Sequence, residues 1–290
     1  MSCGRRQFLQ GCIGSALLGL PASAAWTRTR LGTADISTLS DGYLTVPEPT
    51  VLGAANATAL TERPCNITLL RDGARTIVFD VGAGPNFMPS AGQLGESLSQ
   101  AGIALEDVTD VLFTHAHPDH FWGVLDDFDE PVFPEARYLI NRDERDFWTH
   151  PDTLAKLPEN RQVFASAANR LSAALGDRLE TFQPGDEVAP GIEALATPGH
   201  TPGHCSFVIH RGSESAIVLG DVVVDEAVSF SQPERPLQGD FDPAGAAATR
   251  MTVLDRLAAE RTLLSGFHLT RGGLGYAEKD STGRFHFQPV

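Results

Sequence analysis

Thr114-His115-Ala116-His117-Pro118-Asp119-His120 is the stretch that decides the fold of this chain. It directly follows the apolar, β-prone run 111–113, so we expect it on a loop at the C-terminal end of a strand, where α/β sheets hold their sites. In an extended loop, His115 and His117 point to the same side, whereas Asp119 and His120 lie beyond the proline bend and face a second direction. The stretch therefore predicts the beginning of two metal subsites.

Further candidate ligands lie farther along the chain, at His200, Asp221 and His268. Each comes just after a short run that reads as a strand: Ile192–Ala196, Ala216–Leu219 and Leu263–Phe267 respectively. A single histidine in such a place is more often structural than a ligand. Loops of the same type, each following a strand, predict instead that their side chains meet at one rim of a sheet.

With these residues in place, the chain resembles the metallo-β-lactamase-fold hydrolases, whose pattern is His-x-His-x-Asp-His followed by His, Asp and His. The resemblance covers roughly residues 33–290. It implies an α/β fold, the αββα sandwich, in which two sheets pack face to face with helices outside. It also implies the metal ligands: His115, His117 and His200 for a first ion, Asp119, His120 and His268 for a second, and Asp221 as the bridge between them.

This ligand set implies a metal-dependent hydrolase with two divalent cations. Imidazole and carboxylate ligands suit zinc, and equally iron, manganese or cobalt. Two cations about 3.5–4 Å apart can deprotonate a shared water near neutral pH, so the expected nucleophile is a metal-bridging hydroxide. Asp221 would set the separation of the metals and Asp119 could pass a proton to the leaving group, which makes these two the expected catalytic carboxylates.

The aspartate at position 221 narrows the subfamily. One branch of zinc β-lactamases has a cysteine ligand there and another lacks the bridging aspartate, so antibiotic hydrolysis is not expected as the main activity. The bridged pattern matches glyoxalase II, acyl-homoserine lactone lactonases and organophosphate-hydrolysing relatives. Ile36–Gly42 and Phe241-Asp242-Pro243 look most like the lactonase and methyl-parathion-hydrolase branch. We therefore expect a small-molecule ester, lactone or aryl phosphotriester as substrate.

Three alternatives stay open. Many lactonases of this branch carry a tyrosine three residues after the bridging aspartate, and Val224 stands there instead. A dedicated acyl-homoserine lactone lactonase is therefore an alternative reading. A glyoxalase II-like thioester hydrolase fits poorly, because the segment after Asp221 holds one long helix and a glycine-rich end. A non-catalytic metal-binding relative of the same fold is the third alternative.

The N-terminus has the features of an export signal. Gly4–Gln10 contains the twin arginines Arg5 and Arg6, and an apolar run at 13–20 and the small residues at 22–24 follow. We expect residues 1–24 to be a twin-arginine signal peptide and 25–290 to form a single catalytic domain, delivered to the periplasm or secreted. Cleavage would remove two arginines and no acid, taking the formal charge from −15 to −17. Such an acidic protein is a poor partner for nucleic acid or anionic membranes. The sequence does not decide between a monomer and a homodimer.

Several other residues receive secondary interpretations. Asp80 resembles a position that supports the histidine loop through hydrogen bonds, and His204 is expected behind the ligands at most. His150, His210, His286 and the acidic run 126–130 are expected to be surface features. Cys65 and Cys205 are expected as buried free thiols rather than a disulfide. An apolar entrance, or simply core packing, is expected of four aromatic residues: Phe87, Trp122, Phe147 and Trp148.

The remaining pattern predicts strands, then helices, then strands, then a helix. Strands are expected at 35–39, 66–70, 76–80, 111–114, 137–140, 179–182, 192–196, 206–210, 216–219 and 262–265. Helices are expected at 94–101, 143–148, 161–175 and 243–259. Ser40-Asp41-Gly42 reads as a turn. Residues 47–64 read as a long loop near the site.

Overall fold

The computed structural model describes residues 27–47 and 59–290. The predicted signal peptide, and with it the twin arginines, lies outside the described residues, as do positions 48–58 of the loop expected near the site. Among the described helices, none has the length and apolar character that crossing a membrane requires.

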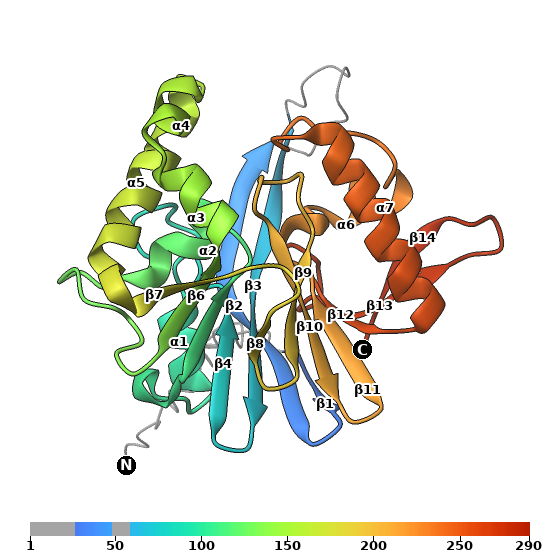
Figure 1. The fold of residues 1–290 in the computed structure, drawn as a ribbon. Coiled ribbons are helices and arrows are strands. Elements are labelled where there is room, and N and C mark those ends of the chain that lie inside the picture. The colour runs from blue at the N-terminus through green and yellow to red at the C-terminus, as the bar shows by residue number, and fades with distance from the viewer. Residues whose placement is uncertain (1–26, 48–58) are drawn as a thin grey trace, which may run out of the picture.

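Residues 27–47 and 59–290 form two seven-stranded sheets packed face to face (Figure 1). The first contains, in spatial order, β1 (Thr27–Leu31), β2 (Ala34–Pro47), β3 (Leu60–Asp72), β4 (Arg75–Phe79), β5 (Asp110–Phe113), β6 (Arg137–Asn141) and β7 (Leu179–Phe182). Its strands run antiparallel as far as β4 and parallel from β4 to β7. β5 is buried along its whole length, and after Asp110, which pairs with Arg75 and Arg137, its side chains are apolar, as is usual for parallel strands covered on both faces.

In the second sheet, as in the first, neighbouring strands are consecutive along the chain. From one edge to the other it contains β14 (Phe285–Pro289), β13 (Leu274–Lys279), β12 (Leu263–Ser265), β11 (Glu214–Val218), β10 (Cys205–Arg211), β9 (Ile192–Ala196) and β8 (Glu187–Ala189). Neighbouring strands are antiparallel except β11 and β12, which are joined by a long crossover. Because β11 and β12 are parallel, their carboxyl ends lie side by side.

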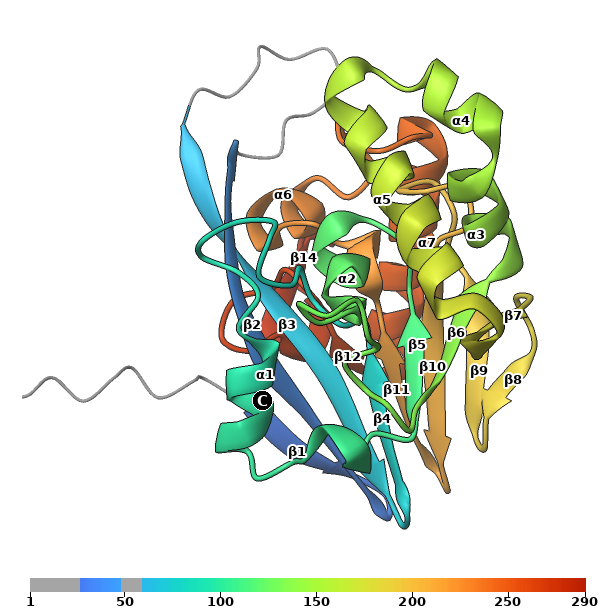
Figure 2. The ribbon, with the colours of Figure 1, turned by 90° about the vertical axis from the view of Figure 1, so that its left-hand side faces the viewer.

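Helices cover the outer face of each sheet, which completes the αββα sandwich. Beside the first sheet lie α1 (Leu94–Gln100), α2 (Pro118–Phe121), α3 (Arg142–Thr149), α4 (Pro151–Lys156) and α5 (Glu159–Leu175). Figure 2 looks onto this side, with α1, α2 and α5 in front of the strands. Beside the second sheet lie α6 (Glu226–Ser231) and α7 (Pro243–Glu260). The expected fold class is confirmed.

Sequence signals explain the longest helix. Asp242 caps α7, because its Oδ1 accepts a hydrogen bond of 3.0 Å from the Gly245 amide, and Pro243 fits the first turn. The buried side chains recur three and four residues apart along one face: Ala246, Ala247, Arg250, Val253, Leu254 and Leu257. That face packs on the second sheet, and the arginine within it has a structural role described below.

The core between the sheets is aliphatic and aromatic. Phe79 of β4 and Phe207 of β10 meet across it, with ring centroids 5.4 Å apart. Ile36 and Ile77 from the first sheet and Ile209 from the second are fully buried in the same cluster. Burial of this kind stabilises the fold by roughly 1.5–3 kcal/mol per large side chain.

Two expectations about the first sheet are wrong. Ser40-Asp41-Gly42 is not a turn, because β2 continues through a bulge whose register shifts between Ser40 and Tyr43. The bulge buries Asp41, whose carboxylate accepts hydrogen bonds from the amides of Ala83, Gly92 and Leu94. Burial raises the pKa of Asp41 to about 6. In addition, residues 60–64 belong to β3 and not to a loop. The strands β1, β8, β13 and β14 had not been expected.

Candidate metal centre

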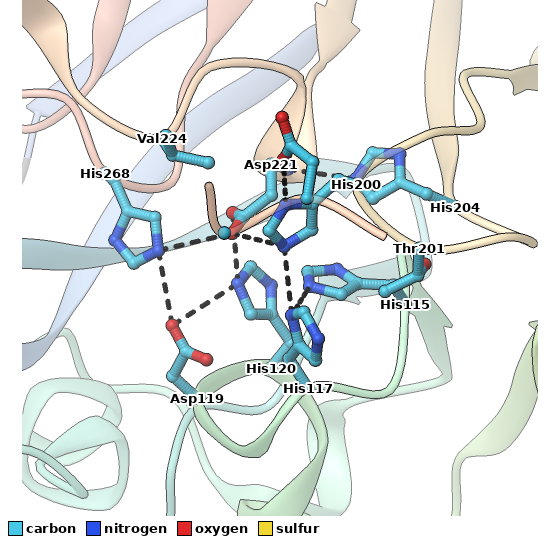
Figure 3. A network of polar contacts seen from close by, with 12 residues as sticks. His115, His117, Asp119, His120, His200, Thr201, His204, Asp221, Val224 and His268 are labelled. Atoms are coloured by element: carbon cyan, nitrogen blue, oxygen red, sulfur yellow. Dashed lines mark hydrogen bonds and ion pairs between the residues drawn. The ribbon is translucent and has the colours of Figure 1, made fainter. Parts of the chain in front are cut away.

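Four loops bring the predicted ligands to one place (Figure 3). His115 and His117 lie in the loop that joins β5 to α2, and Asp119 and His120 lie in α2 itself. His200 lies in the turn between β9 and β10. Asp221 lies in the short 3₁₀ helix η4 (Gly220–Val222) after β11, and His268 follows β12. The loops therefore leave the carboxyl ends of strands in two sheets, whereas the sequence had suggested a single sheet rim. The centre lies where the two sheets meet.

The first ligand group consists of His115, His117, His200 and Asp221, whose ligand atoms lie within 4.8 Å of one another. His117 Nδ1 is 3.0 Å from His115 Nε2 and 2.9 Å from His200 Nε2. His200 Nε2 also lies 3.2 Å from Asp221 Oδ2. Three imidazole nitrogens and one carboxylate oxygen thus converge on a common point.

The second group lies on the other side of Asp221. His120, Asp221 and His268 place their ligand atoms within 4.8 Å of one another. His120 Nε2 is 3.2 Å from Asp221 Oδ1, and His268 Nε2 is 3.2 Å from Asp119 Oδ2. Asp221 is the residue that the two groups share, which is the position of a bridging ligand.

The donor atoms suit divalent cations. Within the described part of the chain, His120 Nε2 and Asp221 Oδ1 are buried and lie 3.2 Å apart, yet neither makes a hydrogen bond of good geometry. Buried polar atoms in native proteins nearly always have a hydrogen-bond or ionic partner. We therefore expect these two atoms to share a bound partner. A cation would satisfy both atoms at once, and imidazole with carboxylate is a donor set that suits zinc and its neighbours.

Electrostatics of the protein without metal lead to the same inference. Burial lowers the pKa of His200, but the carboxylates of Asp221 and Asp240 outweigh it and raise that pKa to about 9. Burial raises the pKa of Asp119, but the His120 and His268 imidazoles outweigh it and lower it to about 2. Negative carboxylates therefore attract positive charge into the centre. A cation can supply that charge in place of protons.

His120 and His268 are each held by a hydrogen bond on the ring nitrogen that faces away from the centre, as metal-ligating histidines usually are. His120 Nδ1 is 2.8 Å from Asp80 Oδ2, and Asp80 also accepts hydrogen bonds from the amide and hydroxyl of Thr114. Asp80 adopts a left-handed backbone with φ of +63° to do this. His268 Nδ1 donates to the Pro64 carbonyl over 2.8 Å. The support expected of Asp80 is present.

Asp240 and Arg250 form a second support that the sequence did not indicate. Asp240 Oδ1 is 2.9 Å from His200 Nδ1, and Asp240 Oδ2 accepts from Arg250 Nη2 at 3.3 Å. Arg250 is 1 % exposed, and its Nε donates to the Val222 carbonyl next to Asp221. One buried arginine therefore connects the loop that carries Asp221 to the residue that orients His200. An arginine on the buried face of a helix was the signal that could have indicated it.

Glu144 is a further residue that sequence reasoning missed. Its buried carboxylate accepts hydrogen bonds from the Ala116 amide (3.0 Å) and the Gly203 amide (3.0 Å). It also accepts from Trp148 Nε1 (2.7 Å) and the Thr201 hydroxyl (2.7 Å). Glu144 thereby joins the histidine loop to the turn that carries His200. Its signal in the sequence is an acid four residues before Trp148, on the buried side of α3.

His204 lies behind the ligands, as expected. Its Nε2 accepts a hydrogen bond of 2.9 Å from the Asp221 amide, and its Nδ1 lies 3.1 Å from the Thr197 carbonyl. Burial, followed by the neighbouring His200, lowers the pKa of His204 to about 3. A neutral imidazole with Nε2 as acceptor therefore positions the Asp221 backbone. His150, His210, His286 and residues 126–130 are exposed, and Cys65 and Cys205 are buried and unpaired.

Aromatic side chains surround the first ligand group. Around His117, the ring centroids of Trp148, Phe164 and Phe241 lie 5.6, 6.0 and 6.1 Å away. Phe87, Trp122 and Phe147 are half-buried in the same cluster, whereas Trp148 is fully buried. Trp148 is thus a core residue. Phe164 and Phe241, which the sequence did not single out as lining residues, also lie against His117. On the other side, His268 borders a groove of about 470 Å³ that Phe230 and Phe287 also line.

Comparison with known proteins assigns the chain to a family. Residues 60–265 match the family model described as the metallo-beta-lactamase superfamily, and the chain belongs to this superfamily. Its relatives in this superfamily include proteins named as N-acyl homoserine lactonases. The family assignment agrees with the resemblance that the histidine motif carries.

Individual relatives are more distant. The chain is 32 % identical over 127 residues to the uncharacterized protein YobT of Bacillus subtilis, covering 43 % of this chain and 49 % of that protein. It is 26 % identical over 164 residues to the N-acyl homoserine lactonase AttM of Azorhizobium caulinodans, covering 56 % of this chain and 57 % of that protein. The chain therefore spans about half the length of these curated relatives.

Two solved structures resemble the whole domain. The hydrolase AbOPH of the beta-lactamase superfamily has a TM-score of 0.84 at 26 % identity, covering 92 % of this chain and 98 % of that chain. AidC, a dizinc quorum-quenching lactonase solved with the product N-hexanoyl-L-homoserine, has a TM-score of 0.83 at 27 % identity, with the same coverage of 92 % and 98 %. Both likenesses extend over both sheets.

Proposed function

We propose that this protein is a dinuclear metallohydrolase of small esters, lactones or aryl phosphotriesters, with zinc as the first candidate metal. The observation that carries the proposal is the position of Asp221, shared between two groups of buried ligand atoms. His115, His117 and His200 would hold one cation, and Asp119, His120 and His268 the other. The dizinc relative AidC supports this reading, since it has the same fold over nearly its full length.

When bound, the two cations would supply a nucleophilic water at neutral pH and polarise the bond that is attacked. The residues of the chain would keep the metal ligands in position. Asp221 orients both ligand groups, and His204 and Arg250 fix the backbone around it. The aromatic side chains near His117 exclude water on one side and provide apolar contact for an acyl or aryl group. Delivery of a proton by Asp119 to the leaving group stays a prediction.

A dedicated acyl-homoserine lactone lactonase is the second candidate. The observation in its favour is the likeness to AidC and AttM, which are lactonases by name. Against it stands Val224, which Figure 3 shows beside Asp221 and His268. Val224 has no side-chain hydroxyl that could donate to a lactone carbonyl or its departing alkoxide.

Substrate preference tests the proposal. The metal-loaded wild type should show a higher kcat/KM on 4-nitrophenyl acetate or an aryl phosphotriester than on a long-chain acyl-homoserine lactone, because the metals alone can stabilise a good leaving group. A missing donor is worth roughly 1–3 kcal/mol, or about ten- to a hundredfold in rate. Val224→Tyr should therefore raise the lactone-to-ester ratio by about tenfold or more.

Val224→Phe is the matched control, since it adds the ring without the hydroxyl and should leave the ratio near that of the wild type. Protein stripped by a chelator should lose activity on all three substrates. A wild type that prefers the lactone by tenfold or more would make the dedicated lactonase the correct function. Turnover that survives complete removal of metal would exclude the metallohydrolase reading.

We also propose that the protein is exported, on the basis of the twin arginines alone. Replacing both Arg5 and Arg6 by lysine keeps the charge of the segment. The double variant should accumulate in the cytoplasm, because the twin-arginine signal depends on that pair, whereas the wild type should be found in the periplasmic fraction. Equal delivery of the two proteins in cell fractionation would refute export by this route.

A further inference from the structure

Cys65 lies beside Asp119 and His268, two of the expected ligands of the second ion, although the seven-ligand pattern contains no cysteine. It belongs to β3 and is fully buried, at 0 % exposure. Its sulfur, an Asp119 carboxylate oxygen and a His268 imidazole nitrogen all lie within 4.8 Å of one another. Ligands of one metal ion lie at such separations, so the thiol is within reach of the ion that Asp119 and His268 would hold.

The backbone on both sides of Cys65 is bonded to the loop that carries His268. The Pro64 carbonyl accepts from His268 Nδ1 at 2.8 Å, and the Asn66 amide donates to the Phe267 carbonyl at 2.9 Å. The Asn66 side chain donates in addition to the Leu269 carbonyl at 2.7 Å. The position of the thiol relative to His268 is therefore fixed by the fold. A site held in this way loses little freedom when a cation binds.

A second observation points to a ligand at the same place. His120 Nε2 is fully buried and makes no hydrogen bond of good geometry within the described residues, although it lies 3.2 Å from Asp221 Oδ1 and 3.5 Å from an oxygen of Asp119, the carboxylate beside Cys65. The surroundings favour positive charge. Three buried carboxylates, those of Asp41, Asp119 and Asp221, lie close enough to act electrostatically on Cys65.

We propose that Cys65 is a sulfur ligand of the second metal subsite, beside Asp119, His120 and His268. Coordination forms a metal–sulfur bond, breaks the S–H bond and releases the proton to solvent. A thiolate favours zinc, cobalt or cadmium over manganese, which prefers oxygen ligands. The donor set then selects for thiophilic cations at this subsite, which the pattern of histidines and aspartates does not do. The inference rests on the proposed two-metal centre.

Cobalt and zinc make the sulfur visible without any activity measurement. Metal-free full-length protein is titrated with Co²⁺, and a sulfur-to-cobalt charge-transfer band is expected in the near ultraviolet. In the zinc-loaded protein, X-ray absorption is expected to show a sulfur neighbour at about 2.3 Å from the metal. Both signals should disappear in Cys65→Ser and in Cys65→Ala, with retained folding checked by circular dichroism.

Cys205→Ser is the matched control. Cys205 is also fully buried, and among the described residues it belongs to no group that could hold a metal. Both sulfur signals should persist in this variant. Cys65→Ser should also bind its second zinc ion at least about tenfold more weakly, since even residues behind the ligands cost ten- to a hundredfold in metal affinity. Its affinity for Mn²⁺ should change less.

Different experimental results would overturn the role of Cys65 and the proposed two-metal hydrolase. Wild-type protein with bound cobalt and zinc but neither sulfur signal would overturn the role of Cys65 and leave the two-metal hydrolase standing. Persistence of the signals in Cys65→Ser would overturn it as well. Uptake of a single ion per chain would contradict the two-metal proposal, and the sulfur signal of that one ion would still decide whether Cys65 is a ligand.

Discussion

Asp221→Ala should reduce the bound metal from two ions per chain to at most one and lower kcat/KM on an activated ester by about a thousandfold or more. Asp221 lies 3.2 Å from His120 Nε2 and 3.2 Å from His200 Nε2, so its carboxylate is the contact between the two ligand groups. A thousandfold loss corresponds to about 4 kcal/mol of barrier, the size expected when one of two metals no longer assists the reaction. Elemental analysis and ester kinetics on the same preparation measure both effects.

Asp127→Ala is the control for this substitution, because it removes one carboxylate from an exposed loop. It should keep two ions and the wild-type rate. Should Asp221→Ala keep two ions or full turnover, the bridging position would be wrong. If the wild type itself, supplied with zinc or manganese, binds no more than one ion, the dinuclear proposal fails.

Glu144→Ala should cost about 3–5 kcal/mol of stability, although Glu144 is not a candidate ligand. The substitution leaves the amides of Ala116 and Gly203, the Trp148 indole and the Thr201 hydroxyl buried without their acceptor. Each unsatisfied buried donor costs about 1–3 kcal/mol, and partial relaxation around the site keeps the total below the sum over four donors. For a domain of this size we expect a fall in Tm of about 10 °C.

Thermal unfolding of the metal-free protein measures this effect apart from metal binding. Asp143→Ala removes an exposed acid from the same helix and should change stability by less than about 1 kcal/mol. Glu144→Gln keeps one acceptor oxygen, so its loss of stability should lie between those of Asp143→Ala and Glu144→Ala. An alanine variant as stable as the wild type would mean that water takes over the four hydrogen bonds.

The histidine motif was sufficient to predict the fold class and the candidate ligands. The reason is that His115, His117, Asp119 and His120 are adjacent in sequence, and their local geometry follows from a strand end and a proline. His200, Asp221 and His268 each follow a recognisable strand, and strand ends place side chains at a sheet edge. The structure brings the seven side chains close together, and the resemblance to the metallo-β-lactamase fold, rather than spacing alone, had implied this set.

Tertiary structure alone decided what surrounds these ligands. Asp240 contacts His200, which lies 40 residues away in the sequence, and the Pro64 carbonyl contacts His268, which lies 204 residues away. Asp41 reads as part of a turn in the sequence, but a bulge in β2 buries it against three amides.

Cys65 carries no local signal at all, since its approach to Asp119 and His268 depends on how β3 of one sheet packs beside the loop after β12 of the other. Local periodicity and motif spacing determine which residues belong to strands, helices and ligand loops. Contacts between distant segments depend on how the two sheets pack, and that packing is a property of the whole chain rather than of any stretch within it.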